Sequence, residues 1–452
     1  MKKLISGLVS VVVLSILLAV SSGSPPASPP SSDVIPPEEW HSPPSSVIMQ
    51  GSMIESADFI VFTDGENYYV KSGDNGEVVG YTSAVSAIQY ALDSVPENGG
   101  VVYLASGTYV LDNYNPEELD FGETNAYSLK IGKPNTTLVG PRSATLRIAS
   151  GINPDGIECY IALLVAAPRC TLTGFTFDGN WSGQTWDNTI VVIHIAGRNY
   201  NADGFTADSL IIENVGLAGT GERYAIYLFT VDDVRITNVR IENVQGTGIV
   251  IDTATNVTIA NNVISYCGEK GIDFTDSKNI VTMNNVISSC SQKSDATYSA
   301  IAVSGGENNL IIGNRIRIGG ENRTKYGIEI SATVSEAILF GNDLTNSGAT
   351  GDFYDASGKA RYLLDIQSGR ATSVIHLSLS GVQENTVSFP VAFPAVPDVV
   401  ITLEYGGENN DSLPINVWIK DITTTGFTFG YLVANPSATD YTENIRWIAT
   451  VA

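Results

Sequence analysis

The strongest constraint on the fold is a short pattern that returns six times between Asp208 and Asn342. Each copy starts on Asp, Asn or Glu, continues with apolar residues and ends six positions later on Asn, at Asn214, Asn238, Asn262, Asn285, Asn314 and Asn342. Successive copies are 24, 24, 23, 29 and 28 residues apart. A β-rich unit of this period cannot bury its apolar face alone and must stack on its neighbours. It is also too short for a strand, a crossover helix and a parallel strand. The pattern therefore predicts the coils of a parallel β-helix.

The recurring Asn has a structural role in such a fold. Equivalent residues of stacked coils lie about 4.8 Å apart. A buried amide can then donate to the amide of the next coil and accept from the one before. We expect all six Asn to form one ladder at one turn of the coil. The residues before four of them, Asn261, Asn284, Gly313 and Gly341, suit a left-handed backbone.

A second recurring segment alternates apolar and variable residues, as half-buried strands do. It occurs at residues 248–252, 271–275, 300–304 and 327–331, and upstream at 225–229 and 192–196. We expect its isoleucines to point inwards and the alternate side chains to point outwards. One outward column contains His194, Tyr227, Val250, Asp273, Ala302 and Glu329, and the other contains Ala196, Phe229, Asp252, Thr275, Ser304 and Ser331.

The N-terminal residues predict export. Residues 1–22 begin with Lys2 and Lys3, continue with an apolar run and end on small residues, as a signal peptide does. The run of about 17 residues also suits an uncleaved anchor, so both alternatives remain open. Residues 23–57 are rich in Pro and Ser and predict a spacer. Together these segments favour a secreted or cell-surface protein.

The acidic composition argues against nucleic acid as a partner. The chain has 24 Lys and Arg against 48 Asp and Glu, a net charge of −24, which repels a phosphate backbone. Surface carboxylates can hold Ca²⁺, so binding of this ion remains an open alternative. No cofactor is indicated, and no His, Cys and carboxylate group has the spacing of a zinc site.

The four cysteines fit an exported protein. Cys267 and Cys290 have the same register in consecutive coils, which places their α-carbons near 5 Å, within the disulfide range. Cys159 and Cys170 flank a single apolar strand and are a second candidate pair. Five glycosylation triplets, at Asn135, Asn180, Asn256, Asn322 and Asn410, are compatible with N-glycosylated surface residues. Asn-rich turns also generate such triplets by chance, and this is a strong alternative.

Residues 83–111 resemble the opening of the pectate-lyase and rhamnogalacturonase-like β-helix proteins. Ser83 caps an amphipathic helix, a Gly-Gly turn follows, and a strand leads to a Gly-Thr-Tyr segment. The segment GFTFDGN at 174–180 resembles a motif where their coils begin. The resemblance covers roughly residues 58–365 and implies a right-handed parallel β-helix at 58–370 with a capping helix. It implies no single activity, because the superfamily includes lyases, hydrolases, epimerases, phage tailspikes and surface proteins.

Residues 371–452 predict a separate antiparallel β-sandwich, with short apolar strands separated by Pro, Gly and Asn turns. The segment resembles the H-type lectin family at 389–390, 397–400, 417–419, 425–429 and 446–449. It is also similar to the tips of viral fibres, so a homotrimer or fibre formed through this domain remains open. Phe389, Phe393 and Trp418 could supply that interface or belong to the sandwich core. The resemblance rests on strand pattern, and no sugar-binding residue carries over.

Candidate catalytic residues lie on the outward columns. Asp252 and Asp273 are one coil and two positions apart, which suggests about 8 Å between their α-carbons. Two carboxylates so placed could act as general acid and base with a water between them, as in inverting glycoside hydrolysis. Lys270 could instead be the base of a lyase if its pKa were lowered. The signature motifs of polygalacturonases and of alginate-modifying β-helices are absent, and ordinary solvated carboxylates are the alternative explanation.

Candidate substrate-binding residues are aromatic or polar side chains near that face. His194, Tyr227 and Glu329 lie on the first outward column, and Trp181 and Trp186 lie on a loop that leaves the coils. An exposed Trp can stack on a sugar ring, although the loop could equally fold over its own aromatics. We therefore expect a surface-displayed protein that binds a polysaccharide or cell-surface glycan, as an adhesin or fibre subunit. The alternative is a secreted polysaccharide lyase or glycoside hydrolase.

Overall fold

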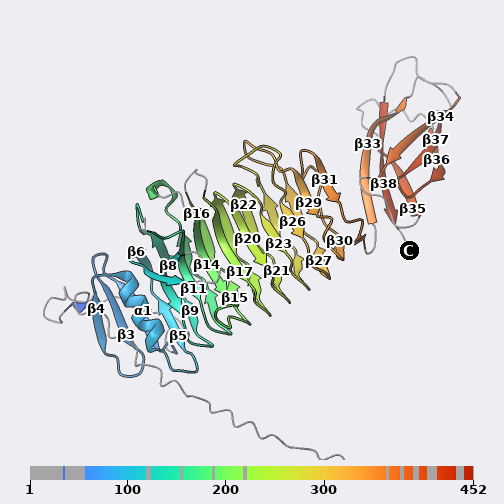
Figure 1. The fold of residues 1–452 in the computed structure, drawn as a ribbon. Helices are drawn as coiled ribbons and strands as arrows, with labels where there is room; N and C mark the ends of the chain where they lie inside the picture. The colour runs from blue at the N-terminus through green and yellow to red at the C-terminus, as the bar shows by residue number, and fades with distance from the viewer. Residues whose placement is uncertain are drawn as a thin grey trace, which may run out of the picture.

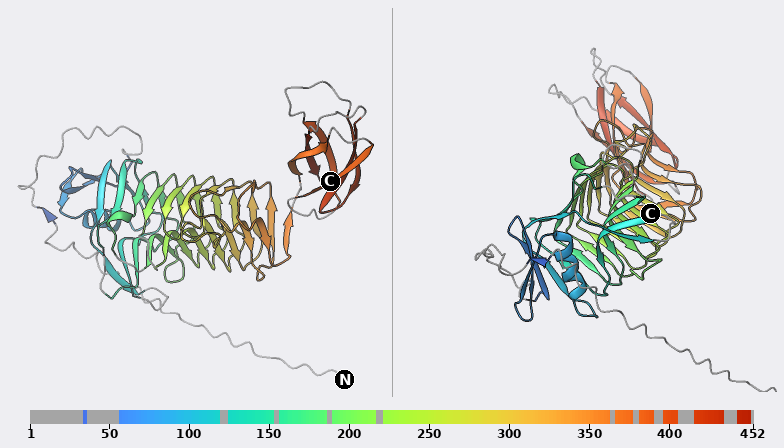
Figure 2. Two further views of the ribbon diagram at one scale, coloured as in Figure 1. Left: turned by 90° about the horizontal axis from the view of Figure 1, so that it is seen from above. Right: turned by 60° about the vertical axis from the view of Figure 1, so that its left-hand side comes forward.

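The computed structural model describes residues 34–35, 56–118, 124–152, 156–185, 189–216, 221–362, 366–376, 381–389, 396–404, 415–433 and 442–450. These residues form an all-β molecule in which parallel coils stack along one axis (Figure 1). An antiparallel sandwich lies beyond the last coil, at the end opposite the capping helix (Figures 1 and 2). The predicted signal peptide at 1–22 lies outside the described residues. No helix within the described ranges has the length and apolar character needed to span a bilayer.

The coils contribute parallel strands to three sheets, here called A, B and C, and one further strand pairs antiparallel with the first coil strand of sheet C. Sheet A contains β5 (Val101–Leu104), β9 (Thr137–Val139), β12 (Thr171–Thr173), β15 (Thr206–Asp208), β18 (Arg235–Thr237), β21 (Thr258–Ala260), β24 (Val281–Met283), β27 (Asn309–Ile312), β30 (Ala337–Phe340) and β32 (Ala360–Tyr362). Sheet B contains β6 (Gly107–Leu111), β10 (Ala144–Ile148), β13 (Thr176–Asp178), β16 (Ile211–Val215), β19 (Arg240–Val244), β22 (Val263–Cys267), β25 (Val286–Ser288) and β28 (Arg315–Arg317). Sheet C contains β7 (Asn115–Glu118), β8 (Thr124–Ile131), β11 (Cys159–Val165), β14 (Thr189–Ala196), β17 (Arg223–Phe229), β20 (Thr247–Asp252), β23 (Ile272–Thr275), β26 (Ile301–Ser304), β29 (Tyr326–Ile330) and β31 (Gly351–Asp355).

A cap closes the first coil. Strands β2 (Phe59–Thr63), β3 (Tyr68–Ser72) and β4 (Val78–Tyr81) form an antiparallel extension of sheet A, and β1 (Val34–Ile35) pairs with β4. Helix α1 (Ala84–Ser94) begins at Ser83, whose side chain accepts a hydrogen bond from the Ser86 amide. The apolar face of α1 is buried against the open end of the coils. The predicted capping helix is therefore confirmed.

The inward column of isoleucines forms the core predicted from the alternating segments. Ile226 pairs with Ile249, Ile249 with Ile272, and Ile272 with Ile301, all within sheet C. All four are fully buried. Because neighbouring side chains on a strand point to opposite faces, this register also confirms that the two predicted outward columns lie on the other face of sheet C.

The Asn ladder forms, but with four members. Asn262 donates to Asn285 at 3.0 Å, Asn285 to Asn314 at 2.9 Å, and Asn314 to Asn342 at 3.0 Å. The residues before these four have φ values between 54° and 60°, as expected for a left-handed turn. The predicted ladder is therefore correct for the later coils.

Asn214 and Asn238 are not part of this ladder. The Asn262 side chain accepts from the amide of Val239, so Val239 occupies the ladder position in that coil and Asn238 precedes it with a φ of 56°. Asn214 lies on β16, in register with Asn243 of sheet B. The sequence pattern did not distinguish the ladder position from the left-handed turns, where Asn is also favoured.

The cysteines are free thiols, which contradicts both predicted disulfides. Cys267 and Cys290 are stacked in the core as expected, but as reduced side chains packed under Gly248 and Gly271. Cys159 and Cys170 belong to different apolar clusters. Cys159 lies on the outer face of sheet C, while the Cys170 thiol donates to the Ala167 carbonyl inside the coil. This second pair therefore points to opposite sides of the coil wall.

The C-terminal strands form two packed antiparallel sheets. One contains β33 (Ile366–His376), β38 (Thr442–Thr450) and β35 (Asp398–Glu404), and the other β34 (Val382–Ser388), β37 (Gly426–Val433) and β36 (Ile415–Ile422). Phe389 is buried in the core between them with Phe427 and Trp447, whereas Trp418 is 39% exposed. Phe393 lies outside the described residues. Strand β33 spans the predicted domain boundary at residue 371.

Candidate functional site

The outer face of sheet C carries a row of polar and aromatic side chains at coil spacing. In-register pairs join neighbouring strands from β14 to β31 through His194, Tyr227, Val250, Asp273, Ala302, Glu329 and Tyr354. The second row passes through Ala196, Phe229, Asp252, Thr275 and Ser304. Sheet C thus brings together the residues that the sequence placed on one face, although it does not expose them equally.

Asp273 is a largely buried carboxylate of this face. Its side chain is 15% exposed and forms an ion pair with Lys270, whose Nζ lies 2.6 Å from Asp273 Oδ2. Asp273 Oδ1 is buried and has no hydrogen-bond partner among the described residues. Burial raises the pKa of Asp273 above its ordinary value, and the negative charge of Asp252 raises it further, against the opposing effect of Lys270. Burial therefore outweighs the ion pair, and Asp273 holds its proton more tightly than a solvated Asp does.

Asp252 lies one strand away from Asp273 and contacts an aromatic ladder. The Tyr227 hydroxyl donates to Asp252 Oδ2 at 3.3 Å. The Tyr227 ring stacks on Tyr224 on one side and on Phe229 on the other, with centroids 5.5 and 6.2 Å apart. Tyr224 belongs to β17 like Tyr227, and sequence reasoning missed it. Tyr224 lies three residues before Tyr227, so strict alternation would place the two side chains on opposite faces and gave no signal for it.

His194 is almost completely covered. It is 2% exposed, and its ring contacts Tyr227 edge-on at 5.1 Å. The neighbouring outer residues Cys159, Leu164 and Val191 are also buried, in a small cluster on the outside of sheet C. Burial lowers the pKa of His194 to about 3. His194 is therefore neutral near pH 7, and the predicted substrate-binding residue has almost no surface to offer a ligand.

Glu329 lies at the C-terminal end of the row. Its carboxylate accepts from Ser299 Oγ at 2.6 Å and pairs with Lys325 at 2.9 Å. The Lys325 ammonium also lies 5.1 Å from the centre of the Tyr326 ring, which stacks on exposed Tyr354. The sequence identified Glu329 but not this cluster, because residues 351–355 do not match the alternating pattern.

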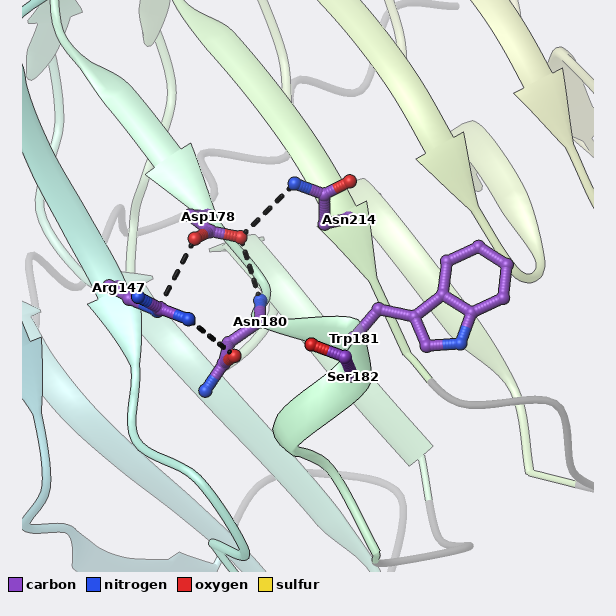
Figure 3. Close-up of a pocket in the computed structure, with 6 residues that line it drawn as sticks. All are labelled: Arg147, Asp178, Asn180, Trp181, Ser182 and Asn214. Atoms are coloured by element: carbon purple, nitrogen blue, oxygen red, sulfur yellow. Dashed lines mark hydrogen bonds and ion pairs between the residues drawn. The ribbon is translucent and has the colours of Figure 1, made fainter.

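The structure describes only one of the two loop tryptophans that were predicted to bind substrate. Trp186 lies outside the described residues. Trp181 begins the short 3₁₀-helix η2 (Trp181–Gly183) and lines a hollow on sheet B, a different face from the row on sheet C (Figure 3). No aromatic ring packs against Trp181 in the described part of the chain. The alternative of a loop folded over its own aromatics stays a prediction, because it also involves Trp186.

Four of the five predicted glycosylation sites can be placed, and Asn410 lies outside the described residues. The Asn180 side chain is 5% exposed, and its amide nitrogen donates to the Ile148 carbonyl and to Ser150 Oγ. The amide nitrogens of Asn135, Asn256 and Asn322 also donate hydrogen bonds. Burial of Asn180 leaves no room for a glycan in this structure. Glycosylation of the other sites remains a prediction.

A metal site was left open by the sequence. Within the described ranges, no group of three or more His, Cys, Asp and Glu side chains is placed to hold a metal ion. Asp273 and Glu329 of sheet C instead pair with Lys270 and Lys325.

Two family models match parts of the chain. Residues 191–363 match the model of the right handed beta helix region, and residues 384–450 match the H-type lectin domain. The chain combines a right-handed β-helix with an H-type lectin domain. These matches agree with the coils and with the C-terminal sandwich, respectively.

Comparison with curated proteins gave no match. Among solved structures, an alginate lyase from a Paenibacillus species is 17% identical, with 61% of this chain and 97% of that chain covered and a TM-score of 0.41. A rhamnogalacturonan lyase is 16% identical over 64% and 74%, with a TM-score of 0.42. A mannuronan C-5 epimerase module from Azotobacter vinelandii is 13% identical over 62% and 93%, with a TM-score of 0.26. At such low identities and TM-scores, these likenesses do not indicate what this chain binds or cleaves.

Proposed function

We propose that the protein is exported and binds polysaccharide along the outer face of sheet C. The observation that carries this proposal is the in-register row of aromatic and carboxylate groups between Tyr227 and Tyr354. Its carboxylates also hold the ammonium groups of Lys270 and Lys325. A sugar chain offers apolar ring faces to aromatic side chains and hydroxyls to carboxylates. The accompanying H-type lectin domain supports a carbohydrate ligand. Display at the cell surface, as an adhesin or fibre subunit, would suit both carbohydrate-facing parts.

A second candidate function is hydrolysis of the bound polysaccharide. The observation that favours it is the raised pKa of Asp273, caused by burial, beside the carboxylate of Asp252. Protonated Asp273 would donate its proton to the glycosidic oxygen as the bond to the anomeric carbon breaks. Asp252 would accept a proton from the water that attacks this carbon from the opposite face. Lys270 is held by Asp273 at 2.6 Å, so a lyase reaction with Lys270 as base would first require that ion pair to break.

The test combines binding and turnover. Purified protein is incubated with a polysaccharide panel, and retention, new reducing ends and unsaturated products are measured. We expect retention by at least one polysaccharide, and weaker retention after Tyr227→Ala. The control is Glu307→Gln, which removes an exposed carboxylate paired with Lys278. Absence of retention by the whole panel would contradict the binding proposal. New reducing ends lost in both Asp252→Asn and Asp273→Asn would support hydrolysis, whereas unsaturated products would support a lyase.

A further inference from the structure

A second polar hollow lies on sheet B, away from the row on sheet C. It has a volume of about 440 Å³, within the range that holds a small organic ligand. Its lining residues come from strands β10, β13 and β16 and from the loop after β13. They are Arg147, Asp178, Asn180, Trp181, Ser182 and Asn214. Figure 3 shows the polar groups of Arg147, Asp178 and Asn214 on one side and the Trp181 indole extending from η2 on the other. The hollow therefore pairs a hydrogen-bonding wall with an aromatic ring.

The hydrogen-bonding wall is already organised. Asp178 Oδ1 accepts from the backbone N–H of Asn180 at 2.9 Å and from Asn214 Nδ2 at 3.3 Å. Arg147 Nε lies 3.4 Å from Asp178 Oδ2, and its Nη2 donates to Asn180 Oδ1 at 2.8 Å. These contacts hold the side chains in place before any ligand arrives, which lowers the entropic cost of binding.

The loop that carries Trp181 is also anchored. Asn180 has a left-handed backbone, and its buried amide donates to the Ile148 carbonyl and to Ser150 Oγ. Gln184 is buried at the other end of η2 and donates to the Ala149 and Gly179 carbonyls. Trp181 thus lies between two buried side chains that fix the path of the backbone. No aromatic ring within the described ranges stacks on its indole, which leaves the ring faces free of aromatic neighbours.

A row of carboxylates continues from the hollow along sheet B. Asp178 is in register with Glu213, and Glu213 with Glu242. Asp178 is paired with Arg147 and Glu242 with Arg240, but Glu213 has no ion pair in the described part of the chain. Burial and the charges of Asp178 and Glu242 raise the pKa of Glu213. The row therefore offers hydrogen-bond acceptors and repels additional negative charge.

We propose that this hollow is a separate carbohydrate subsite that selects uncharged pyranose units. One sugar ring stacks on Trp181, and its hydroxyls donate to Asp178 and accept from Asn214 and Arg147. The next units extend along the row towards Glu213. A uronate unit is disfavoured beside Glu213, because the carboxylates of Asp178 and Glu242 are paired with Arg147 and Arg240 and the charge of Glu213 is left in excess. The inference rests on the proposed carbohydrate function but not on the residues of sheet C.

Affinity gel electrophoresis of the full chain tests this subsite. The probes are two neutral polysaccharides, galactomannan and xyloglucan, and two polyuronates, alginate and polygalacturonate. We expect Trp181→Ala to weaken binding of a neutral polysaccharide by about tenfold, because it removes the stacking surface. Glu213→Gln should leave polyuronate binding equal or stronger, since it removes one repelling charge. The control is Phe340→Ala, which removes an exposed aromatic side chain from sheet A. It should change the binding of neither the neutral polysaccharides nor the polyuronates.

Other outcomes separate this inference from the proposed function. If Trp181→Ala and Asp178→Asn leave neutral binding unchanged while Tyr227→Ala abolishes it, the subsite proposal is overturned and the face on sheet C stands. If Trp181→Ala weakens polyuronate binding as much as neutral binding, the proposed selectivity is wrong. If the wild-type chain binds neither class of probe, the subsite proposal fails together with binding along sheet C. Circular dichroism of each variant shows whether the coils remain folded.

Discussion

At the scale of single residues, burial decides the chemistry of the candidate face. Asp273 and His194 occupy equivalent positions in different coils of sheet C, yet burial shifts their pKa values in opposite directions. It raises the pKa of Asp273 and lowers that of His194, because it disfavours the charged form of each group. At both positions an apolar side chain would reduce the stability of the folded chain less than the polar group does. Such a loss of stability is common where function constrains a site.

Replacing Asp273 by Asn tests whether this carboxylate serves function at the expense of stability. The raised pKa means that the charged form is less favourable in the folded chain than in the unfolded chain. Stability therefore falls as pH rises above the ordinary Asp value of 3.8 and through the raised pKa of the folded state. At pH 7 we expect Asp273→Asn to be neutral or stabilising by less than about 1 kcal/mol, since half-buried Lys270 can turn to solvent. Urea unfolding measures this, and a loss of several kcal/mol would show that the ion pair is structurally essential.

The buried imidazole of His194 should make the free energy of unfolding depend on pH in the opposite direction. Its pKa is about 3 in the folded chain against an ordinary value of 6.5, so the unfolded chain binds a proton first as pH falls. Stability is then lost as pH falls from 6.5 towards 3, by about 2 to 3 kcal/mol at pH 4.5. His194→Leu removes this contribution. The difference in unfolding free energy between wild type and variant, measured at pH 7 and pH 4.5, should change by that amount, and equal differences at both pH values would contradict the assigned burial.

At the scale of elements, stacked turns hold the coils in register. Each buried Asn of the ladder bridges two coils. Gly248 of β20 and Gly271, directly before β23, let the backbone and the thiols approach closely. A Cβ on Gly271 would lie 2.7 Å from Ile287 and 2.8 Å from the Ala300 carbonyl. A second, exposed series of turn amides runs through Asn256, Asn279 and Asn308. The buried Asn ladder should contribute more to stability than the exposed turn amides, because water cannot replace hydrogen bonds that are lost in the core.

The matched pair Asn285→Ala and Asn279→Gly tests this difference. The Asn285 side chain makes four hydrogen bonds, donating to the Ile259 carbonyl and to Asn314 and accepting twice from Asn262. Its removal leaves buried groups unpaired, and we expect a loss of about 3 kcal/mol or more. Asn279 is exposed with a φ of 55°, where Gly is well tolerated, so this variant should lose less than about 1 kcal/mol. Equal unfolding midpoints for both variants would contradict a structural role of the buried ladder.

At the scale of the whole molecule, a solenoid and a sandwich divide the chain into two different kinds of core. The solenoid core runs along the coils and is closed by α1 at one end. The sandwich has a compact core of its own, built around Phe427, Phe429 and Trp447. Its exterior carries exposed apolar side chains, including Val382, Val400 and Trp418. A separate core predicts independent folding, and exposed apolar residues are suited to an interface.

Two fragments test where the sandwich begins. Residues 366–370 of β33 pair with β38, so a fragment of residues 366–452 should unfold cooperatively and at a higher temperature than residues 371–452. Thermal unfolding followed by circular dichroism compares them. Equal melting temperatures would show that these five residues contribute little to the sandwich.

Sedimentation of the stable fragment and of the full chain tests assembly. A homotrimer is expected if the exposed apolar residues form an interface, and Trp418→Lys should then shift it to monomer. A monomeric wild type for both proteins would contradict the fibre or adhesin hypothesis in its oligomeric form.

The sequence by itself determined the repeating architecture. The period of the Asn pattern and the alternation of isoleucines are local properties, and stacking of identical units converts them directly into register. For that reason Asp252, Asp273 and Glu329 were placed on the correct face of sheet C, and α1 was placed as a lid. The H-type lectin resemblance was likewise visible in strand pattern alone.

Only the tertiary structure decided which of these positions are accessible and what they meet. His194 follows the same alternation as Tyr227 but lies in a covered cluster on the same face. Cys159 and Cys170 are close in sequence but point to opposite sides of the coil wall. The hollow on sheet B brings Arg147, Asp178 and Trp181 together from different coils and a loop. Periodicity fixes the direction in which a side chain points, but burial and cavities depend on loops whose packing has no period.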